Sequence, residues 1–383
     1  MNSTSNKGAT RRDVIRSTGA ATAFTIMSAK SVRGSQANST LSVGLIGSGN
    51  RGSYDASIVQ ADPRAQITAM CDIFPDQFEK AQQRIKAPNP AKYSDFEKLL
   101  ASGVDAVLIT TPVFEHPRML LAAVQAKKHA YCEKPAGVDA EGCFEITRAG
   151  RLAGKEINIS FGFQQRYGPV YLEAFKRVND GSIGKLVNAR ASWLGGGSTT
   201  PVPPAKTWEE KLRGWYGYPE LCGDIIVEQD CHNFDVLHWF LDSVPLRAMG
   251  IGGRKVRYWR ETMDHLSVSY EWPNNMVVNY EANQFSPRPW RRVGEEFTGS
   301  EGVIEVSRRG MKQTKPPNDI ETMDSKRDIT MDALEAFIER VQTGNYENVA
   351  ERSARSTMIA ILGREAIYAG REMTWRELYG VRG

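Results

Sequence analysis

Two spacings of hydrophobic residues alternate along residues 41–162, one typical of buried strands and one typical of helices. Short apolar runs predict buried strands, and segments with apolar residues at helical spacing separate them. The predicted strands are Leu41–Ile46, Ala65–Cys71, 105–110, His129–Cys132 and 156–162. The predicted helices are 51–60, Pro75–Ile85, 95–101, 117–126 and 139–153. Strands and helices that alternate in this way predict a parallel, doubly wound α/β sheet with right-handed crossovers.

The pattern changes after about residue 165, where strands follow one another with few helices between them. Strands are predicted at 187–193, 246–252, 265–271, 276–282, 294–298 and Val303–Val306. Helices are predicted at 224–241, 331–342 and 349–369, the last ending at Gly370. We therefore expect an α+β domain with a large, mostly antiparallel open sheet.

The N-terminal 37 residues have the order of a signal peptide. Arg11 and Arg12 precede an uncharged run at 17–29, and small residues at 35–37 resemble a cleavage site. The arginine pair predicts export by the Tat route, to the periplasm or another compartment outside the cytoplasm. The run is too short to span a bilayer, so no membrane span is expected after the leader is removed.

Removing this leader changes the charge of the chain. The whole sequence has a net charge of +4, but residues 1–37 hold six basic residues and one acidic residue. The remaining chain has a net charge of −1, which argues against a nucleic-acid partner. Its five cysteines include no C-x-x-C pair and are expected to be unpaired packing residues, with no metal site.

A glycine motif follows the first predicted strand directly. In Gly47-Ser48-Gly49-Asn50-Arg51-Gly52, the first glycine permits a tight turn and the second lets the backbone approach a pyrophosphate. The third permits close packing of helix against strand, and the helix N-terminus faces the anion. We predict a dinucleotide-binding domain at residues 40–163 and a substrate and oligomerisation domain at 164–383.

Asp72 ends the second predicted strand, 20 residues after Gly52. A carboxylate at this place accepts hydrogen bonds from ribose hydroxyls and repels a 2′-phosphate, which favours NAD over NADP. Arg51 leaves NADP open as the lesser choice, because its side chain could reach a 2′-phosphate.

Two further segments carry groups suited to proton transfer. Tyr131-Cys132-Glu133-Lys134-Pro135 follows the fourth predicted strand, at the edge of the sheet where ligands bind. In the predicted helix 224–241, Glu228, Cys231, His232 and Asp235 are spaced to share one face. An acid and a histidine on one face can supply a base and a group that orients it.

Together these motifs resemble the glucose–fructose oxidoreductase, inositol dehydrogenase and rhizopine-catabolism family (Gfo/Idh/MocA) over nearly all of residues 40–380. The resemblance rests on the glycine motif, Thr110-Thr111-Pro112 with His116, Glu133-Lys134-Pro135, Phe163-Gln164-Gln165-Arg166-Tyr167, and His232 with Asp235. The tail at 360–364 and 374–378 is typical of exported members.

The resemblance implies that Lys134 contacts the nicotinamide ribose and a substrate hydroxyl, and that His232 is the general base. Glu228 stands where many members have Asp, so its assisting role is open, and Val113 replaces a frequent Asn. Expected cofactor contacts are Gly47, Gly49, Asn50, Arg51, Gly52, Asp72, Thr111, Pro112, His116, Glu133, Lys134 and Gln164. Expected substrate contacts are Arg166, Tyr167, Trp215, Tyr216, Glu228 and His232.

Aromatic and basic side chains in the loop at 195–219, with the resemblance, favour a carbohydrate or polyol substrate and leave an acidic sugar open. Three functions are compatible with the sequence. The first is an NAD-dependent oxidoreductase with tightly bound, internally recycled NAD, as export from the cytoplasmic NAD pool would require. The second is a redox-neutral, NAD-dependent glycosidase, and the third is a non-catalytic sugar-binding protein. A homo-oligomer is expected, with one face of the second sheet as its interface.

Overall fold

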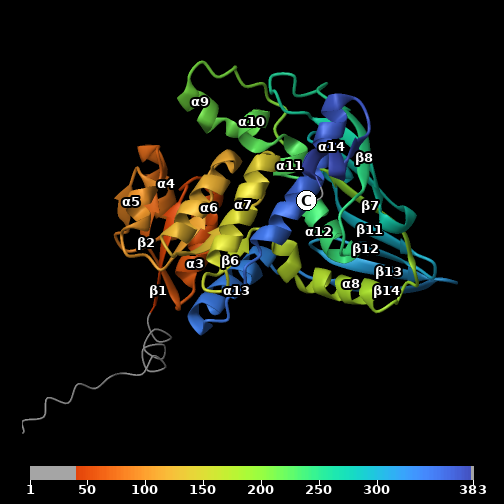
Figure 1. Cartoon of the computed structure of the whole chain (residues 1–383), viewed down its shortest axis with the longest axis horizontal. Helices are drawn as coiled ribbons and strands as arrows, with labels where there is room; N and C mark the ends of the chain where they lie inside the picture. Colours follow the sequence, from red (N-terminus) through yellow and green to blue (C-terminus); the bar gives the residue numbers. More distant parts are fainter. Residues whose placement is uncertain (1–39, 381–383) are drawn as a thin grey trace, which may run out of the picture. The chain divides into compact units, whose positions relative to one another are not determined.

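Two β-sheets organise the chain in the computed structural model, which describes residues 40–380 (Figure 1). The predicted leader at 1–37 lies outside the described residues. Consistent with the pattern of the sequence, the first sheet is built from residues 41–161 and the second from residues 186–374.

The first sheet has six parallel strands in the order β3-β2-β1-β4-β5-β6. They are β1 (Leu41–Ile46), β2 (Ala65–Cys71), β3 (Ala91–Tyr93), β4 (Ala106–Ile109), β5 (His129–Cys132) and β6 (Ile159–Phe161). Its helices are α3 (Asn50–Ala61), α4 (Pro75–Ile85), α5 (Phe96–Leu100), α6 (His116–Gln125) and α7 (Ala140–Ala153). The prediction of a parallel α/β sheet is confirmed. Only β3 was not predicted, since it is short and two of its three residues are exposed.

Local capping explains where several of these helices begin. The side chains of Asp95 and Asp139 accept hydrogen bonds from the N–H groups of Glu97 and Gly142, which begins α5 and α7. Proline at the first position of α4 lacks the N–H group that would be unpaired there.

The second sheet has nine strands in the order β14-β13-β12-β11-β7-β10-β9-β8-β15. They are β7 (Leu186–Leu194), β8 (Arg247–Gly253), β9 (His265–Trp272), β10 (Met276–Asn283), β11 (Arg292–Gly299), β12 (Val303–Val306), β13 (Gly310–Lys315), β14 (Asp319–Asp324) and β15 (Met373–Thr374). All neighbours are antiparallel except β7 and β10. The predicted, mostly antiparallel sheet is confirmed. The sequence missed β13 to β15, of which β14 is polar and exposed.

Helices cover one face of this sheet and leave the other open (Figure 1). Strand β10 alternates buried and exposed residues, as a sheet with one covered face requires. On the covered face, Phe240 of α12 (Cys231–Leu241) stacks on Phe297 of β11 with ring centroids 4.5 Å apart. Helices α8 (Pro169–Asn179) and α14 (Ala350–Ala369) lie on the same side. Gly370 ends α14 in the left-handed conformation, as predicted.

Helix α13 (Ile329–Thr343) packs against the first sheet, although it follows the second in sequence. Phe337 of α13 meets Tyr131 of β5 edge to face, with ring centroids 5.7 Å apart. This contact belongs to a buried cluster that also contains residues of β1, β2 and α3. The chain therefore returns to its first sheet after building most of the second.

The helix predicted at 224–241 is not continuous, which corrects the sequence analysis. It consists of α11 (Ile225–Glu228) and α12, because the N–H groups of Gln229 and Asp230 both donate to the carbonyl oxygen of Ile225. The extra residue widens one turn, a distortion that is frequent at functional sites.

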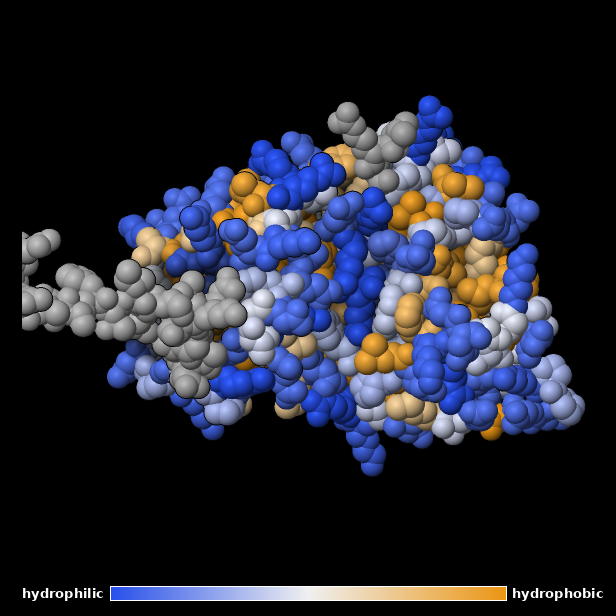
Figure 2. All heavy atoms as spheres, turned by 60° about the horizontal axis from the view of Figure 1, so that its bottom comes forward, coloured by the Kyte–Doolittle hydropathy of each residue, from blue (hydrophilic) through white to orange (hydrophobic). Residues whose placement is uncertain are grey.

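The surface of the described residues is largely polar. The face that Figure 2 shows carries hydrophilic residues over most of its area, with hydrophobic residues in small separate groups. Within residues 40–380, no helix has both the length and the apolar character needed to cross a membrane. All five cysteines are buried and free, as the sequence predicted.

Candidate active site

The glycine motif packs tightly on one side and is open on the other. Gly47 has φ +92°, and a Cβ atom there would lie 2.8 Å from the backbone of Thr110. A Cβ atom on Gly52 would lie 2.0 Å from the carbonyl oxygen of Gly47. A Cβ atom on Gly49 would meet nothing within 4 Å. The loop is thus held against β4 and α3, and its open side at the start of α3 fits the approach of a pyrophosphate.

Asp72 lies beside this loop at the end of β2. Its carboxylate accepts hydrogen bonds from the N–H groups of Ser48 at 2.7 Å and Phe74 at 2.9 Å. Burial raises its pKa above the usual value, although these two donors act against that rise. Each carboxylate oxygen keeps a second lone pair, which can accept a ribose hydroxyl.

Arg51 is held by two carboxylates beneath the glycine loop. Its Nη2 and Nε atoms donate to Oε1 of Glu133 at 2.7 and 2.9 Å, and Nε lies 3.1 Å from Oδ2 of Asp55. Asp55 is fully buried, and burial together with Glu133 raises its pKa well above the usual value. The sequence analysis did not identify Asp55, because a carboxylate inside an amphipathic helix resembles a surface residue. Asn50 is exposed at the start of α3.

His116 joins the segments that follow β4 and β5. Its ring nitrogens lie 2.9 Å from the carbonyl oxygen of Thr111 and 2.8 Å from that of Pro135, and its side chain is buried. This arrangement positions the Thr111–Pro112 turn rather than offering the imidazole to a ligand. Val113 is also buried, so this position presents no polar group.

Lys134 and Glu228 connect the two parts of the site. Nζ of Lys134, at the edge of the first sheet, donates to Oε1 of Glu228 at 2.9 Å and to its carbonyl oxygen at 2.5 Å. Burial alone would lower the pKa of Lys134, but Glu228, together with Cys231 and Glu133, more than offsets burial, and the pKa is raised. Lys134 therefore remains an ammonium group close to the predicted base.

His232 lies in an aromatic setting at the start of α12. Its ring stacks on Trp193 of β7 with centroids 5.9 Å apart, and Phe163 meets it edge to face at 6.2 Å. Its Nδ1 atom is buried without a hydrogen-bond partner in the described residues. Burial, then Arg308 and Lys134, lower its pKa well below the usual value. A neutral imidazole results, with the capacity to accept a proton.

Asp235 does not orient His232, which corrects the expectation that these groups act on one helical face. The carboxylate of Asp235 accepts Nε and Nη2 of Arg166 at 2.9 Å and the hydroxyl of Ser356 at 2.7 Å. It therefore joins α12 to α14 and to the segment after β6.

Arg166 and its neighbours, predicted as ligand contacts, have partners within the protein. The guanidinium of Arg166 is committed to Asp235, and its side chain is only 12% exposed. The hydroxyl of Tyr167 accepts a hydrogen bond from Arg340 of α13 at 3.2 Å. The side chain of Gln164 is buried, and its amide nitrogen donates to the hydroxyl of Thr330 at 3.5 Å. The structure brings none of these three side chains to Lys134.

Tyr216 lines a pocket of about 380 Å³ whose wall includes residues next to His232 and Glu228. Trp193, which stacks on His232, lines this pocket, as does Gln229, the residue after Glu228. The hydroxyl of Tyr216 donates to Oε1 of Gln229 at 2.7 Å, and Trp215 packs edge-on against Tyr216. We call this cavity the arginine pocket. It is lined by Trp193, Gly195, Gly196, Gly197, Ser198, Tyr216, Gln229, Arg257, Arg260, Gln284 and Arg291.

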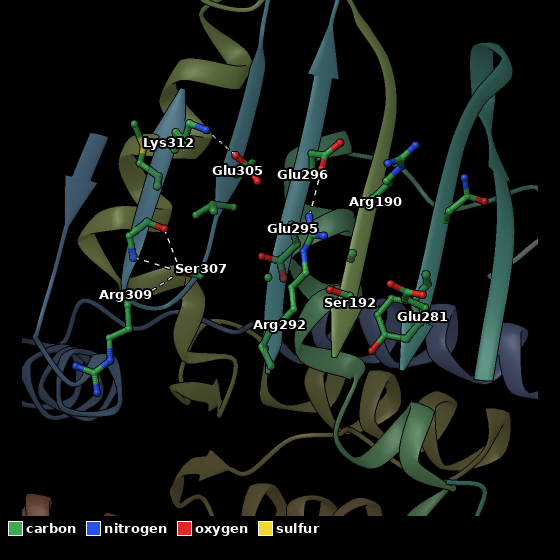
Figure 3. A pocket seen from close by; sticks show the side chains of 18 of the residues that line it. Arg190, Ser192, Glu281, Arg292, Glu295, Glu296, Glu305, Ser307, Arg309 and Lys312 are labelled. Atoms are coloured by element: carbon green, nitrogen blue, oxygen red, sulfur yellow. Dashed lines mark hydrogen bonds and ion pairs between the residues drawn. The ribbon is translucent and has the colours of Figure 1, made fainter. Parts of the chain in front are cut away.

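A larger hollow, of about 820 Å³, lies on the open face of the second sheet (Figure 3). Charged side chains project into it from several strands, with Arg292 facing Glu296 and Lys312 facing Glu305 at 3.6 Å. His232 and Lys134 line neither cavity. The arginine pocket, although smaller, is the better candidate for the substrate, because Trp193 in its wall stacks on His232 and Gln229 follows Glu228, the partner of Lys134.

Trp193, Arg308, Arg257 and Arg260 were not predicted as site residues. Each lies at or beyond a strand end in a sheet whose neighbours are distant in sequence. A tryptophan ending a strand and two arginines within four residues at 257–260 are the only sequence signals that could have pointed to them.

Family models place the chain in a known family. A model described as the oxidoreductase family with an NAD-binding Rossmann fold matches residues 41–161, and the C-terminal domain model of the same family matches residues 171–305. The chain belongs to the Gfo/Idh/MocA family of oxidoreductases.

Several relatives in this family are inositol dehydrogenases. An inositol 2-dehydrogenase/D-chiro-inositol 3-dehydrogenase of Lactiplantibacillus plantarum is 33% identical over 37% of this chain and 41% of its own. An inositol 2-dehydrogenase of Acidiphilium cryptum is 30% identical over 57% of this chain and 60% of its own. The matches thus span less than two thirds of these relatives.

Solved structures share the fold over most of the described chain. A levoglucosan dehydrogenase in complex with NADH and levoglucosan has a TM-score of 0.75 at 18% identity, covering 88% of this chain and 99% of that chain. A myo-inositol 2-dehydrogenase from Lactobacillus plantarum has a TM-score of 0.72, also at 18% identity, with the same coverage. These similarities establish the fold.

Proposed function

We propose that this protein is an NAD-dependent oxidoreductase that acts on a hydroxyl group of a sugar, glycoside or polyol. The observation that carries the proposal is the convergence of a buried ammonium and a neutral histidine between the two sheets. Lys134 comes from the edge of the first sheet and is held by Glu228 at 2.9 Å. The charges of Arg308 and Lys134 add to burial in keeping His232 neutral.

His232 and Lys134 have different roles in the oxidation of an alcohol. His232 accepts the hydroxyl proton, and the Lys134 ammonium stabilises the negative charge that develops on the oxygen. NAD, when bound, supplies the hydride acceptor. Glu228 keeps Lys134 charged and in position. Relatives that are inositol dehydrogenases support a substrate of the broad sugar and polyol class.

NAD is the proposed cofactor in preference to NADP. Asp72 places a carboxylate beside the glycine loop, where a 2′-phosphate would be repelled. Arg51, the residue most able to offset that repulsion, is committed to Glu133 and Asp55. The preference is tested by comparing the dissociation constants of NAD and NADP, and tighter binding of NADP would contradict it.

The segment at 195–219 supports retention of the cofactor. Its helix α9 (Trp208–Arg213) reaches the carboxyl edge of the first sheet, where Arg213 pairs with Asp76 at 2.9 Å and lies over the ring of Phe74 at 3.9 Å. Trp208 meets Phe114, beyond β4, edge to face at 6.5 Å. Helix α9 therefore contacts the segments that follow β2 and β4, next to Asp72. We call residues 208–213 the strap.

A retained cofactor would reconcile this fold with export by the Tat route, which the leader predicts. Outside the cytoplasm no free NAD pool exists, so the enzyme would need a dissociation constant of ~1 nM or less, about −12 kcal/mol. The cofactor would then be restored by a second substrate. The same retention suits a redox-neutral glycosidase, in which NAD is restored within one cycle. A non-catalytic sugar-binding protein would not need the charged Lys134 beside His232.

The open face of the second sheet is the proposed oligomer interface. Besides the hollow of Figure 3, it carries Met249 and Ile251 of β8, with exposed fractions of 60% and 80%. Exposed apolar residues beside complementary charges are typical of protein interfaces. Light scattering on Ile251→Asp against the wild-type protein tests this, and an unchanged mass would contradict it.

One experiment separates the oxidoreductase from the glycosidase. The purified protein is denatured to measure bound NAD, and the native protein is then offered polyols and aryl glycosides. NADH formation from a polyol supports the oxidoreductase. Aglycone release without net NADH identifies the glycosidase instead, and absence of NAD binding contradicts both.

A further inference from the structure

Three arginines line the arginine pocket without a carboxylate partner. Arg257, Arg260 and Arg291 all contribute to its wall, and none of its lining residues is acidic. Within residues 40–380, none of the three forms an ion pair. By contrast, the nearby Arg213 has Asp76 and Glu209 as partners.

Arg257 is the most deeply placed of the three. Its side chain is only 3% exposed, Nη1 donates to Oε1 of Gln284 at 2.9 Å, and Nε is buried without a partner in the described residues. Burial and then the neighbouring Arg260 lower its pKa, and Tyr216 and Asp264 offset this lowering only in part. A buried charge without a partner is costly, so an anion that entered the pocket would relieve an existing penalty.

The neighbouring acid, Asp264, does not supply that partner. Its Oδ2 atom accepts the backbone N–H groups of Lys255, Val256 and Arg257, and its Oδ1 atom contacts His265. Asp264 therefore shapes the loop that carries Arg257 and leaves the guanidinium groups of the pocket open to a ligand.

Arg260 adds a second uncompensated cation beside an aromatic surface. Its guanidinium lies 5.4 Å from the ring centroid of Tyr216, and Nη1 is buried without a hydrogen-bond partner in the described residues. Trp193 provides a second aromatic wall. Aromatic faces pack on the C–H faces of sugar rings, whereas guanidinium groups bind carboxylate, sulfate or phosphate oxygens in a bidentate manner.

The aromatic wall also fixes where this pocket lies relative to the chemistry. Trp193 both lines the pocket and stacks on His232, and Gln229 in its wall follows Glu228, the partner of Lys134. A sugar in the pocket would thus have its hydroxyl groups near the base and its charged substituent near the arginines.

We propose that the arginine pocket binds an oxyanion substituent of the substrate, so that the protein acts on an acidic sugar rather than on a neutral polyol. The inference rests on the proposed function, because it assigns the substrate class of the same site. The oxyanion is a carboxylate, a sulfate ester or a phosphate ester, which share the chemistry that guanidinium groups recognise.

Binding of paired acidic and neutral sugars to the NAD-loaded protein tests the inference. Calorimetry at constant ionic strength compares glucose, galactose and mannose with the uronate, 6-sulfate and 6-phosphate of each. At least one acidic sugar should bind at least about tenfold more tightly than its neutral partner. Arg260→Gln and Arg291→Gln should each lower that preference about tenfold, and neither change removes a fully buried side chain. Arg151→Gln, on the exposed surface of α7, is the control for net charge.

Two results would overturn the inference: no acidic sugar binding more tightly than its neutral partner, or a preference that survives in both pocket variants. These results are independent of hydride transfer. An acidic sugar that binds but yields no NADH would retain the pocket and contradict the oxidoreductase. NADH formation from neutral sugars without a charge preference would support the oxidoreductase and contradict the proposed role of the pocket.

Discussion

The ammonium group of Lys134 and the carboxylate of Glu228 form an ion pair at 2.9 Å that joins the two sheets across the candidate site. Lys134 follows β5 of the first sheet, and Glu228 ends the short helix α11 that precedes α12. Both side chains are nearly buried, with exposed fractions of 14% and 13%. The pair keeps Lys134 charged, and the charge of Lys134 acts on the proposed base, so removing the pair has a defined consequence for pH dependence.

Glu228→Gln should lower kcat and move the alkaline limb of the pH–rate profile to lower pH. The Glu228 carboxylate raises the pKa of Lys134 against the effect of burial, so without it the ammonium loses its proton at a lower pH. We expect a loss of kcat of about 10²-fold near neutral pH, as for removal of one preorganised charge. Glu220→Gln, whose partner is Lys211 near the surface, is the control. An unchanged alkaline limb would contradict the proposal that Glu228 raises the pKa of Lys134.

Arg308→Met should raise the pKa of His232. Burial is the largest cause of the lowered pKa, and the charge of Arg308 is the next. Because His232 is neutral well below its usual pKa of about 6.5, the wild-type acid limb of kcat/KM should lie below that pH. Removing the Arg308 cation should shift this limb upward. Arg309→Met, the exposed neighbour, should leave it in place. An acid limb of kcat/KM at the same pH in Arg308→Met and Arg309→Met would contradict the assignment of this limb to His232.

Gly49→Ala and Gly52→Ala should separate cofactor binding from folding. A Cβ atom on Gly49 meets nothing in the protein, so Gly49→Ala should unfold at the wild-type temperature but bind NAD at least about tenfold more weakly. A Cβ atom on Gly52 would collide with the carbonyl oxygen of Gly47, so Gly52→Ala should also lose stability. Calorimetric melting and NAD titration measure the two effects. Unchanged NAD affinity in Gly49→Ala would contradict a pyrophosphate at this loop.

Arg213→Ala should release NAD faster than the wild-type protein does. The change removes the ion pair with Asp76 and the contact with Phe74 that fasten the strap beside Asp72. We expect the dissociation rate to rise about tenfold, measured by the loss of bound NAD during gel filtration or after dilution into a competitor. Arg148→Ala breaks an exposed pair on α7 and should release NAD at the wild-type rate. Equal rates for Arg213→Ala and the wild type would show that the strap does not retain the cofactor.

The sequence predicted the first sheet closely because its signals are local. Each strand is a short apolar run, the glycine motif follows β1 directly, and Asp72 lies at the end of β2 as expected. Helices α13 and α14 of the second domain were predicted, α13 from its apolar spacing, whereas α8 was not. The break after Glu228 was not predicted either, because it depends on one shifted hydrogen bond to Ile225 that leaves no mark in the hydrophobic pattern.

The substrate side of the site was less predictable, since it is assembled by contacts between distant segments. Trp193 reaches His232 because β7 lies between β10 and β11, a strand order that no local pattern encodes. Arg166 has a partner in Asp235 that lies 69 residues further along the chain. A polar residue next to a motif therefore looked like a ligand contact in the sequence, whereas the structure uses it to join helices.

The most direct test of the proposed oxidoreductase is a single turnover with His232→Ala. Both the variant and the wild-type protein are loaded with NAD and mixed with excess substrate, chosen as the best ligand in the sugar panel, and NADH absorbance is followed. His129→Ala is the control, because His129 lies at the opposite end of the strand that leads to Lys134 and its Nδ1 atom accepts the N–H of Asn158. We predict a burst of NADH from the wild type and from His129→Ala, and none from His232→Ala despite intact NAD binding. A burst of equal rate from His232→Ala would contradict the account.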